Sequence, residues 1–547
     1  MKKKLLSGLL CAIMTVSLLA GCGSSAPADD TGAAEESTEA KTGEEAEAVE
    51  ATEDTAAPAG DGLSISVCAG SEDAMIVDTA RSATLEGLSA CRHLFEGLYK
   101  LDENGQVALG QASDVQISDD GLTYTFTLRD DITWSDGQAV TAGDFIYGWQ
   151  YLKDKASDYC DLLSMISETE ATDDKTLVVT LAYPCAYLPS VLAFPSAYPV
   201  RQDMVETYGE SYATDPDKAV YNGAYVMTEW THQESMVMVA RDDYYDADAI
   251  TVKEITWQLM TDTSTMLASY QSGDIIYSNS YPEEGALEDV QFAPGYSTYC
   301  TMFNMGEKGP DVLKDAKVRK ALSLAIDRNR LVSIRDLGDE LATTYAPSGL
   351  TNESGTEFNS TVTPWFSVDE ADYEANCEEA KALLAEAGYA DGAGFPALSY
   401  LVNNDARKEI AEAIVSDWKE VLGIDSVTVE ISDSFFSQRS DQDYDIAYYG
   451  WFMDYPDISN MMYTFVSGVS DSGYGSEEYD AAYNAAISNP DVEVQWENYR
   501  KCEDLLAEEA PVAPLFHQQN SYLFNPDAYA GLVYYCGNCF FGYLTEK

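Results

Sequence analysis

Residues 445–457 read DIAYYGWFMDYPD, which fits a β-strand followed by an abrupt break. From Ile446 onward the side chains alternate between two faces and are rich in aromatic residues, a mixture that suits a pleated, half-buried surface. Pro456 then ends ladder pairing, because proline has no backbone N–H to donate. A strand end that presents Asp454 beside aromatic side chains can hold a small cationic group. The alternative interpretation is a core strand followed by an ordinary tyrosine–proline turn.

The composition excludes several classes of function. The 547 residues are enough for two or three domains. Acidic residues outnumber basic ones by 94 to 31, and the resulting formal net charge of −63 repels phosphate backbones. We therefore expect no nucleic-acid binding. The three histidines, His93, His232 and His517, are too scattered to form a histidine-rich metal site.

The amino terminus has the layout of a secretory signal. Three lysines follow Met1, and residues 5–19 form an apolar run too short for an ordinary membrane-spanning helix. Residues 19–22 read LAGC, which resembles the lipobox of bacterial lipoproteins. The resemblance implies that residues 1–21 are a signal peptide and that the thiol of Cys22 carries the lipid. The alternative is a plain secretory signal followed by a chance cysteine.

Residues 22–62 join this cysteine to the rest of the chain. Between residues 29 and 61 there are twelve acidic residues and a single lysine, Lys41, with almost no large apolar side chain. Such a segment cannot bury enough apolar surface to offset the entropy lost on ordering. The composition predicts a disordered, acidic tether.

From Leu63 onward, strand and helix patterns alternate without an internal repeat. Residues 123–128 and 176–181 alternate as half-buried strands, and Thr141 fits the N-cap of a helix. Apolar residues at helical spacing predict further helices, two of them closed by glycine. These helices cover residues 315–332, 369–387, 406–422 and 491–509.

Several motifs follow one another in a specific order. They are LFEGLYKLDENGQ at residues 94–106, the TYTFTLRDDITWSDGQAVTAGDFIYGWQYL run at residues 123–152, and NGAY at residues 222–225. The ordered set, which extends over residues 63–547, resembles the peptide and oligopeptide solute-binding proteins of ABC importers, the extracytoplasmic family five. We assign these motifs to folding rather than to ligand binding.

The resemblance implies an α/β, two-lobed periplasmic-binding-protein-like fold of class II, type C, with a two-strand hinge and an extra peripheral subdomain. Closure of the lobes around a ligand couples occupancy to a shape that a partner can recognise. The implied division places lobe I in residues 63–96, 201–296 and 540–547, its peripheral subdomain in residues 97–200, and lobe II in residues 297–539.

The resemblance also implies a set of ligand-binding residues. Asp454 falls where oligopeptide binders place the aspartate that holds the α-amino group of the peptide, a charge-assisted bond that is strong in a desolvated cleft. Trp451, after Gly450 in the family's Gly-Trp pair, and Tyr159 from the other lobe would wall side-chain pockets. Arg407 and Arg439 fall where the family carries basic residues near the ligand carboxylate. Each arginine has the alternative role of a surface ion-pair partner.

The chain also departs from the family pattern at other positions. Tyr448, two residues before Gly450, stands where well-known oligopeptide binders carry an arginine, and Ser432 stands where relatives have a tryptophan. The loss of a cation and an aromatic ring indicates a pocket shaped for a different length or class of ligand. Tyr448 remains a candidate ligand-binding residue.

No catalytic motif accompanies these residues. We find no GxSxG, SxxK or P-loop pattern, and the CxxC at residues 536–539 is a weak redox or metal signal. We therefore predict a non-enzymatic, monomeric lipoprotein that needs no cofactor, captures short peptides outside the cytoplasm and delivers them to a membrane permease. One alternative is the same fold with an oligosaccharide or a metal chelate as ligand; another is an extracellular hydrolase with an acidic pair.

Overall fold

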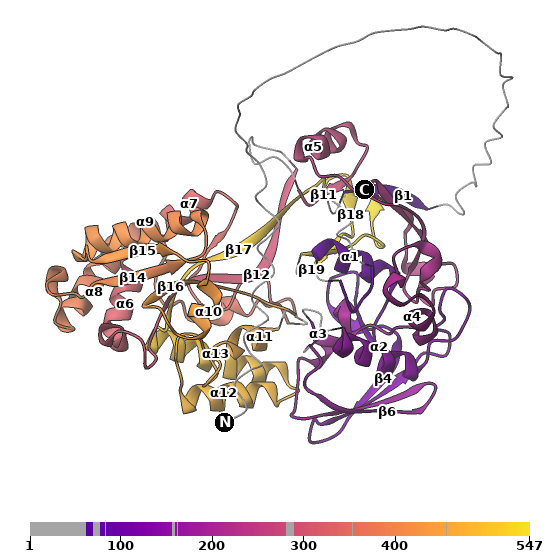
Figure 1. The fold of residues 1–547 in the computed structure, drawn as a ribbon, viewed down its shortest axis with the longest axis horizontal. Coiled ribbons are helices and arrows are strands. Elements are labelled where there is room, and N and C mark those ends of the chain that lie inside the picture. The colour runs from indigo at the N-terminus through magenta and orange to yellow at the C-terminus, as the bar shows by residue number, and fades with distance from the viewer. Residues whose placement is uncertain are drawn as a thin grey trace, which may run out of the picture.

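The chain forms two lobes joined by two long strands (Figure 1). The computed structural model describes residues 62–68, 77–82, 84–155, 159–160, 162–280, 289–352, 354–455, 457–535 and 537–547. Strands β12 (Val290–Phe303) and β17 (Val512–Phe524) run from one lobe into the other and pair antiparallel with each other. The expected two-lobed α/β fold with a two-strand connection is confirmed.

The first lobe, here called lobe I, is built on a four-stranded sheet. Its strand order is β1-β10-β9-β8, with β1 parallel to β10 and the other neighbours antiparallel. Helix α1 (Leu85–Leu94) packs against this lobe, and its N-cap Thr84 accepts a hydrogen bond from Gly87 N at 3.1 Å. The strands are β1 (Leu63–Val67), β8 (Tyr225–Thr231), β9 (Ser235–Ala240) and β10 (Val252–Gln258).

A second four-stranded sheet, wholly antiparallel, lies at the outer side of lobe I (Figure 1). In its order β4-β5-β7-β6, the two central strands bury alternate side chains, as the sequence predicts. Its strands are β4 (Ala112–Ile117), β5 (Thr123–Leu128), β6 (Ile166–Asp173) and β7 (Thr176–Leu181). Nearby helices are α2 (Ala142–Asp154), α3 (Leu188–Leu192) and α4 (Gln202–Tyr208).

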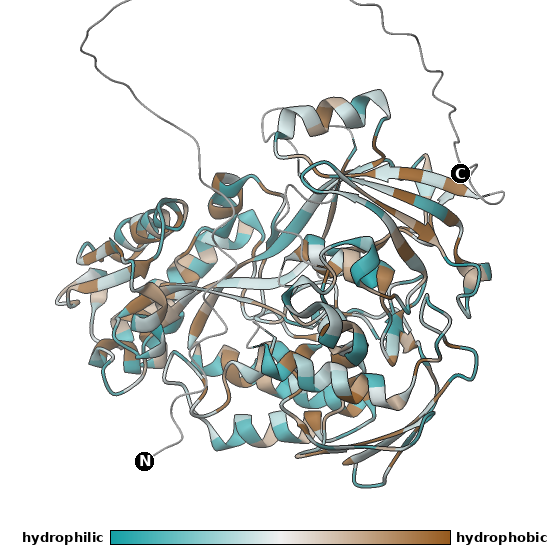
Figure 2. Ribbon diagram, turned by 45° about the vertical axis from the view of Figure 1, so that its right-hand side comes forward, coloured by the Kyte–Doolittle hydropathy of each residue, from teal (hydrophilic) through white to brown (hydrophobic). Residues whose placement is uncertain are grey.

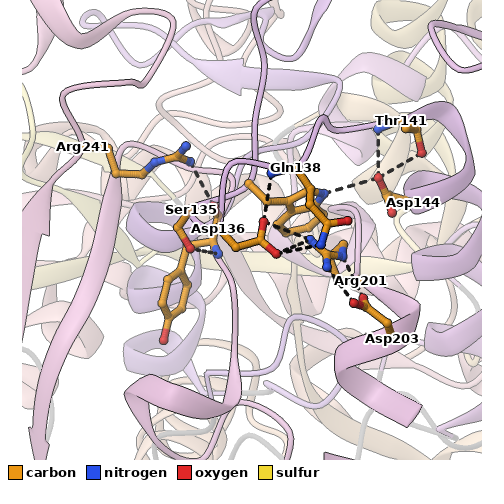
Figure 3. A network of polar contacts seen from close by, with 10 residues as sticks. Ser135, Asp136, Gln138, Thr141, Asp144, Arg201, Asp203 and Arg241 are labelled. Atoms are coloured by element: carbon orange, nitrogen blue, oxygen red, sulfur yellow. Dashed lines mark hydrogen bonds and ion pairs between the residues drawn. The ribbon is translucent and has the colours of Figure 1, made fainter. Parts of the chain in front are cut away.

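The WSDGQ motif supplies a polar network that joins this sheet region to lobe I (Figure 3). Asp136 accepts two hydrogen bonds from Gln138 and two from Arg201, whose guanidinium also pairs with Asp203 at 2.7 Å. Asp144 closes the capping box of α2 by accepting the backbone N–H of Thr141 at 2.8 Å. These contacts are internal to the fold, which agrees with an architectural role for the motif.

Lobe II is a sheet covered by helices that carry both apolar and polar faces (Figure 2). The order β11-β17-β12-β16-β14-β15 combines the two long strands with a parallel group. The parallel group is β14 (Leu398–Val402), β15 (Val427–Ile431) and β16 (Ile446–Phe452). The helices of this lobe are α6 (Ala316–Leu324), α7 (Arg328–Arg335), α8 (Tyr373–Glu386), α9 (Asp405–Leu422), α10 (Phe435–Ser440), α11 (Ile458–Tyr463), α12 (Glu477–Ile487) and α13 (Val492–Glu509).

One predicted helix is wrong in its continuity. Residues 315–332 form two helices, α6 and α7, instead of one. Asp327 caps α7 by accepting the backbone N–H of Arg330 at 3.2 Å. The buried guanidinium of Arg328 donates to the carbonyls of Ser323, at the end of α6, and Pro514, on β17. At the break, the Ser323 carbonyl accepts the N–H of Ile326 and the guanidinium of Arg328 in place of the bond that a continuous helix would make.

Short elements complete the described chain. A helix, α5 (Thr263–Ser272), ends at Gly273, which has a left-handed φ of 82°. The short strands are β2 (Tyr99–Leu101), β3 (Val107–Leu109), β11 (Tyr277–Ser278), β13 (Glu340–Leu341), β18 (Tyr529–Ala530), β19 (Val533–Tyr535), β20 (Asn538–Phe540) and β21 (Thr545–Glu546). Among the helices of the described ranges, none has the length and apolar character needed to cross a membrane. The predicted lobe boundaries stay a prediction.

The two long strands are irregular where they leave lobe I. The pairing of β12 with β17 shifts register between Pro294 and Thr298. Tyr296, inside this break, has a positive φ of 49°. Its carbonyl accepts the N–H of Met453, just beyond the end of β16, at 3.1 Å. The irregular point of the connection is thereby bonded to the residue that precedes Asp454.

His93 ties the carboxyl-terminal strands to α1. Its Nδ1 donates to the carbonyl of Ser89 at 2.8 Å, and its Nε2 accepts the N–H of Phe541 at 3.0 Å. Both ring nitrogens are used by the neutral imidazole, which is fully buried between aromatic rings. Burial lowers the pKa of His93 from 6.5 to about 4.

We predict that His93 makes the protein less stable in mild acid. Folding favours the neutral ring, so its contribution is present above pH 6.5 and is lost as the pH falls toward the folded pKa of about 4. Urea unfolding should show that the free energy of unfolding falls by about 2 kcal/mol more for the wild type than for His93→Gln between pH 7 and pH 4.5. His232→Gln, at an exposed histidine, is the control. Equal pH slopes for the wild type and His93→Gln would contradict the assignment.

Candidate functional site

At the end of β16, the predicted site residues Trp451 and Asp454 both contact the side chain of Asn460. The indole N–H of Trp451 donates to Oδ1 of Asn460 at 2.7 Å, and the amide nitrogen of Asn460 donates to Oδ2 of Asp454 at 3.3 Å. Asn460 lies on α11, whose N-cap Asp457 accepts the backbone N–H of Ser459 at 2.9 Å. The amide therefore fixes the orientation of both the carboxylate and the indole.

Asp454 is electrostatically unusual among the many acidic residues. Burial raises the pKa of its carboxyl, and the hydrogen bond from Asn460 opposes that rise. In the part of the chain that the structure describes, no lysine, arginine or histidine forms an ion pair with Asp454. A desolvated carboxylate with one amide partner is suited to receive a cation from a ligand.

Tyr448 and Gly450 lie on the face of β16 opposite to Trp451, where they meet Tyr299 of β12. A Cβ on Gly450 would lie 2.5 Å from Cε1 of Tyr299, so only glycine leaves space for this ring. Tyr448 is 1% exposed, and its hydroxyl has no hydrogen-bond partner within the described residues. Glycine at 450 thus lets two tyrosine rings pack side by side, with centroids 5.4 Å apart.

Arg407 lies over these two rings. Its guanidinium carbon is 5.4 Å from the centroid of Tyr448 and 5.9 Å from that of Tyr299, within cation–π range. The residue is in the first turn of α9, and its Nη1 donates to Oδ1 of Asn403 at 2.7 Å. No carboxylate of the described chain pairs with it, so the ion-pair alternative does not describe its surroundings.

Arg439 is placed differently. Its Nε pairs with Oδ2 of Asp471 at 2.8 Å, and its guanidinium lies 5.1 Å from the ring centroid of Tyr449. Tyr449 points away from Tyr448, because successive strand residues face opposite sides. Arg407 and Arg439 therefore lie on opposite faces of β16. The geometry of Arg439, 4% exposed, favours the ion-pair alternative in a buried form.

Tyr159 is in lobe I and is 7% exposed. Its ring packs edge-on against Phe194 with centroids 4.8 Å apart, just beyond α3. At the other end of α3, Tyr187 stacks on Tyr455, the residue after Asp454, at 5.0 Å. The short helix α3 thus links the surroundings of Tyr159 to those of Asp454.

Two residues of this site were missed by sequence reasoning. The only sequence feature that pointed to Asn460 was Asp457, an N-cap residue that predicts a helix start after the proline. Tyr187 gave no signal, since its partner Tyr455 is distant in sequence.

Cys22 and Cys536 lie outside the described residues. Cys539 is buried, donates to the hydroxyl of Tyr277 at 3.0 Å and has a pKa raised to about 12 by burial. The described residues contain no cluster of three or more potential metal ligands.

The geometry defines a class of protein: two lobes joined by two long strands and, near this connection, the carboxylate of Asp454, which no cationic side chain of the described residues pairs. The chain belongs to the bacterial extracellular solute-binding proteins, family 5, whose model matches residues 106–473. It is an extracytoplasmic solute-binding protein by this membership. The family expected from the motif series is confirmed.

Curated relatives match most of the chain. The periplasmic oligopeptide-binding protein OppA of Salmonella typhimurium is 32% identical over 470 residues, which are 80% of this chain and 83% of that protein. The dipeptide-binding protein of Lactococcus lactis is 30% identical over 475 residues, 79% of this chain and 85% of that one. The probable deoxycholate-binding periplasmic protein YgiS of Escherichia coli is 30% identical over 465 residues, which are 79% of this chain and 84% of that protein.

Solved structures match most of the chain, both without ligand and with a bound peptide. MppA, a periplasmic murein tripeptide binding protein in its unliganded open form, matches with a TM-score of 0.76 and 26% identity over 87% of this chain and 96% of that one. OppA of Haemophilus influenzae in complex with the peptide RPPGFSPFR matches with a TM-score of 0.62 and 26% identity over 88% and 99%. At equal identity, the TM-score is higher for the unliganded open form than for the peptide complex.

We predict that Gly450→Ala is destabilising. The added Cβ would lie 2.5 Å from the Tyr299 ring, which is itself packed between other side chains, and such overpacking costs about 1–3 kcal/mol. Urea unfolding measures the change. Gly143→Ala in α2 is the matched control, because its Cβ would meet its nearest neighbour at 3.5 Å, and it should be neutral or stabilising. Equal stability of Gly450→Ala and wild type would show that the tyrosine pair is not tightly packed.

Proposed function

We propose that this protein is the substrate-binding lipoprotein of an ABC importer, which captures oligopeptides between its lobes and delivers them to a membrane permease. The observation that carries the proposal is Asp454, a desolvated carboxylate held by Asn460 and lacking a cationic partner in the described chain. A free peptide always supplies one ammonium group at its amino terminus. The relatives named as oligopeptide- and dipeptide-binding proteins support this ligand class.

Each end of the ligand has a chemically suitable partner. Asp454 would hold the α-amino group, with Trp451 and Tyr159 walling side-chain pockets and Gly450 leaving backbone accessible beside them. Main-chain hydrogen bonds would add affinity without reading side chains. At the far end, Arg407 would attract the ligand carboxylate, and the hydroxyl of Tyr448 would donate a hydrogen bond to it. Arg439, already paired with Asp471, would then support the site from the opposite face of β16.

The cellular context follows from the amino-terminal residues and the family. Cleavage before Cys22 and acylation of its thiol would anchor the mature protein to the cell membrane, with the acidic segment as a tether. The protein would act as a monomer. Its lobes would close around the ligand by bending at the β12–β17 connection, and the permease would recognise the closed shape. We propose no catalytic step and no cofactor.

A second candidate ligand class is a non-peptide solute on the same fold. The observation that favours it is the 30% identity to YgiS, which is named as a probable deoxycholate-binding protein. The departures at Tyr448 and Ser432 fit a pocket that no longer matches well-known oligopeptide binders. An oligosaccharide or a metal chelate belongs to the same alternative. Affinity for such a solute that does not depend on Asp454 would favour it over peptides.

We predict that Asp454→Asn weakens binding of trialanine by at least about 100-fold, because a desolvated ammonium would lose its counter-charge. Isothermal titration calorimetry measures the change. N-acetylated trialanine, which has no ammonium, should bind the wild type weakly and the variant equally weakly. Asp457→Asn is the matched control: the residue lies three positions away and caps α11, and asparagine is also a good N-cap.

The pH dependence has a defined direction. Peptide affinity should fall as the pH drops through the raised pKa of Asp454, because the protonated carboxyl cannot pair with ammonium.

Unchanged trialanine affinity in Asp454→Asn would refute the assigned role of this carboxylate. Absence of binding to any di- to pentapeptide would refute the peptide ligand itself.

We predict that Arg407→Gln lowers affinity for peptides with a free carboxyl terminus by about tenfold, since one charge-assisted bond is lost. Peptides with an amidated carboxyl terminus should bind the wild type and the variant alike. Lys408→Gln is the control, because this neighbour on α9 lies near Glu412 at 3.7 Å instead of over the tyrosine rings. Equal losses for free and amidated peptides would assign Arg407 a purely structural role.

A further inference from the structure

The lobes touch at a second place besides the β12–β17 connection. The backbone N–H of Ala186, just before α3 in lobe I, donates to the carbonyl of Ile487 at the end of α12, at 3.0 Å. Beside this bond, the rings of Tyr187 and Tyr455 stack with centroids 5.0 Å apart and an interplanar angle of 9°. In Figure 1 the two lobes approach each other near α3 and α11.

This contact lies next to the predicted ammonium site. Tyr455 follows Asp454 directly, and its carbonyl accepts the N–H of Asp457 at 2.9 Å. On the other side of Asp454, Met453 donates its N–H to Tyr296 in the irregular part of β12. Asp454 therefore lies on a short link between two attachments, one to the hinge strand and one to lobe I.

The ring of Tyr187 is well fixed. The residue is 7% exposed and sits at the N-cap position of α3, where Ala186 is already hydrogen-bonded to α12. A near-parallel pair of partly and fully buried rings loses much contact area if either side is truncated. Truncation of Tyr187 would release the ring of Tyr455 and with it the turn that carries Asp454.

We propose that Tyr187, although in lobe I, is a positioning residue for Asp454 in lobe II. The proposal rests on the proposed peptide-binding function. By clamping Tyr455, Tyr187 holds the carboxylate in the orientation that receives the ligand ammonium, because binding groups must be held to within a fraction of an ångström for full affinity. The contact also lets lobe I support a residue of lobe II before ligand arrives.

The direction of the effect separates this role from a simple open-state latch. If the stack only stabilised the open arrangement, Tyr187→Leu would free the lobes to close and would increase peptide affinity. If the stack positions Asp454, Tyr187→Leu should weaken trialanine binding by about tenfold. Tyr187→Phe keeps the ring and should bind trialanine as the wild type does.

A double-mutant cycle tests whether Tyr187 acts through Asp454. Calorimetry with trialanine should show that Tyr187→Leu has no further effect in an Asp454→Asn background, the non-additivity expected of residues acting as a unit. Tyr147→Leu is the matched control: Tyr147 stacks on Tyr151 at 6.1 Å and 13° within α2 of lobe I, and its effect should not depend on residue 454. Tighter binding by Tyr187→Leu, or an effect that adds fully to that of Asp454→Asn, would overturn the proposal.

Hydrogen exchange of the ligand-free protein gives a readout that needs no peptide. Tyr187→Leu should speed exchange of the amides of residues 453–460, whereas Tyr187→Phe and Tyr147→Leu should leave them unchanged. Unchanged exchange in Tyr187→Leu would overturn the clamp. If no peptide bound the wild type, the proposed function would fail, and the exchange result would still decide whether Tyr187 holds this turn.

Discussion

Strand β12 pairs with β17 along one edge and with β16 along the other, and the rest of the structure depends on this double pairing. Its pairing with β16 is regular, whereas its pairing with β17 shifts register between Pro294 and Thr298, where the strand leaves lobe I, and again between Tyr299 and Cys300. At that break the carbonyl of Tyr296 accepts the N–H of Met453, so the irregular point of the connection is bonded to the residue before Asp454. Any rotation at this break would therefore act directly on the strand end that carries the candidate site.

Charge in this protein acts through burial more than through number. The chain has 94 acidic residues, and most of those that the structure describes are exposed to water, which screens their charge. At Asp454, desolvation raises the pKa of the carboxyl, and its hydrogen-bond partner among the described residues is the amide of Asn460. On the face of β16 opposite to Trp451, Arg407 lies over Tyr448 and Tyr299 without a carboxylate partner in the described chain. The end of β16 and the first turn of α9 thus present one carboxylate and one guanidinium that no opposite charge of the described chain pairs.

The sequence predicts elements well where local pattern and tertiary packing agree. Strands β5 and β7 have the predicted bounds because their alternation matches a half-buried sheet. The helix predicted over residues 315–332 is broken because Arg328 reaches Ser323 and Pro514, a contact that no local pattern encodes. The same limit applies to the site. Asp454 and Trp451 follow from the strand end, whereas Asn460 and Tyr187 enter through contacts made only after folding.

The most direct test of peptide capture is native mass spectrometry of the purified, undenatured protein, followed by release and sequencing of any ligand that remains bound. Desolvation of Asp454 favours retention of an ammonium-bearing ligand in the closed state. The expected result is a set of short peptides with unblocked amino termini, depleted in protein that carries Asp454→Asn. Recovery of a sterol-like acid or a sugar as the bound species, with no peptide, would contradict the account.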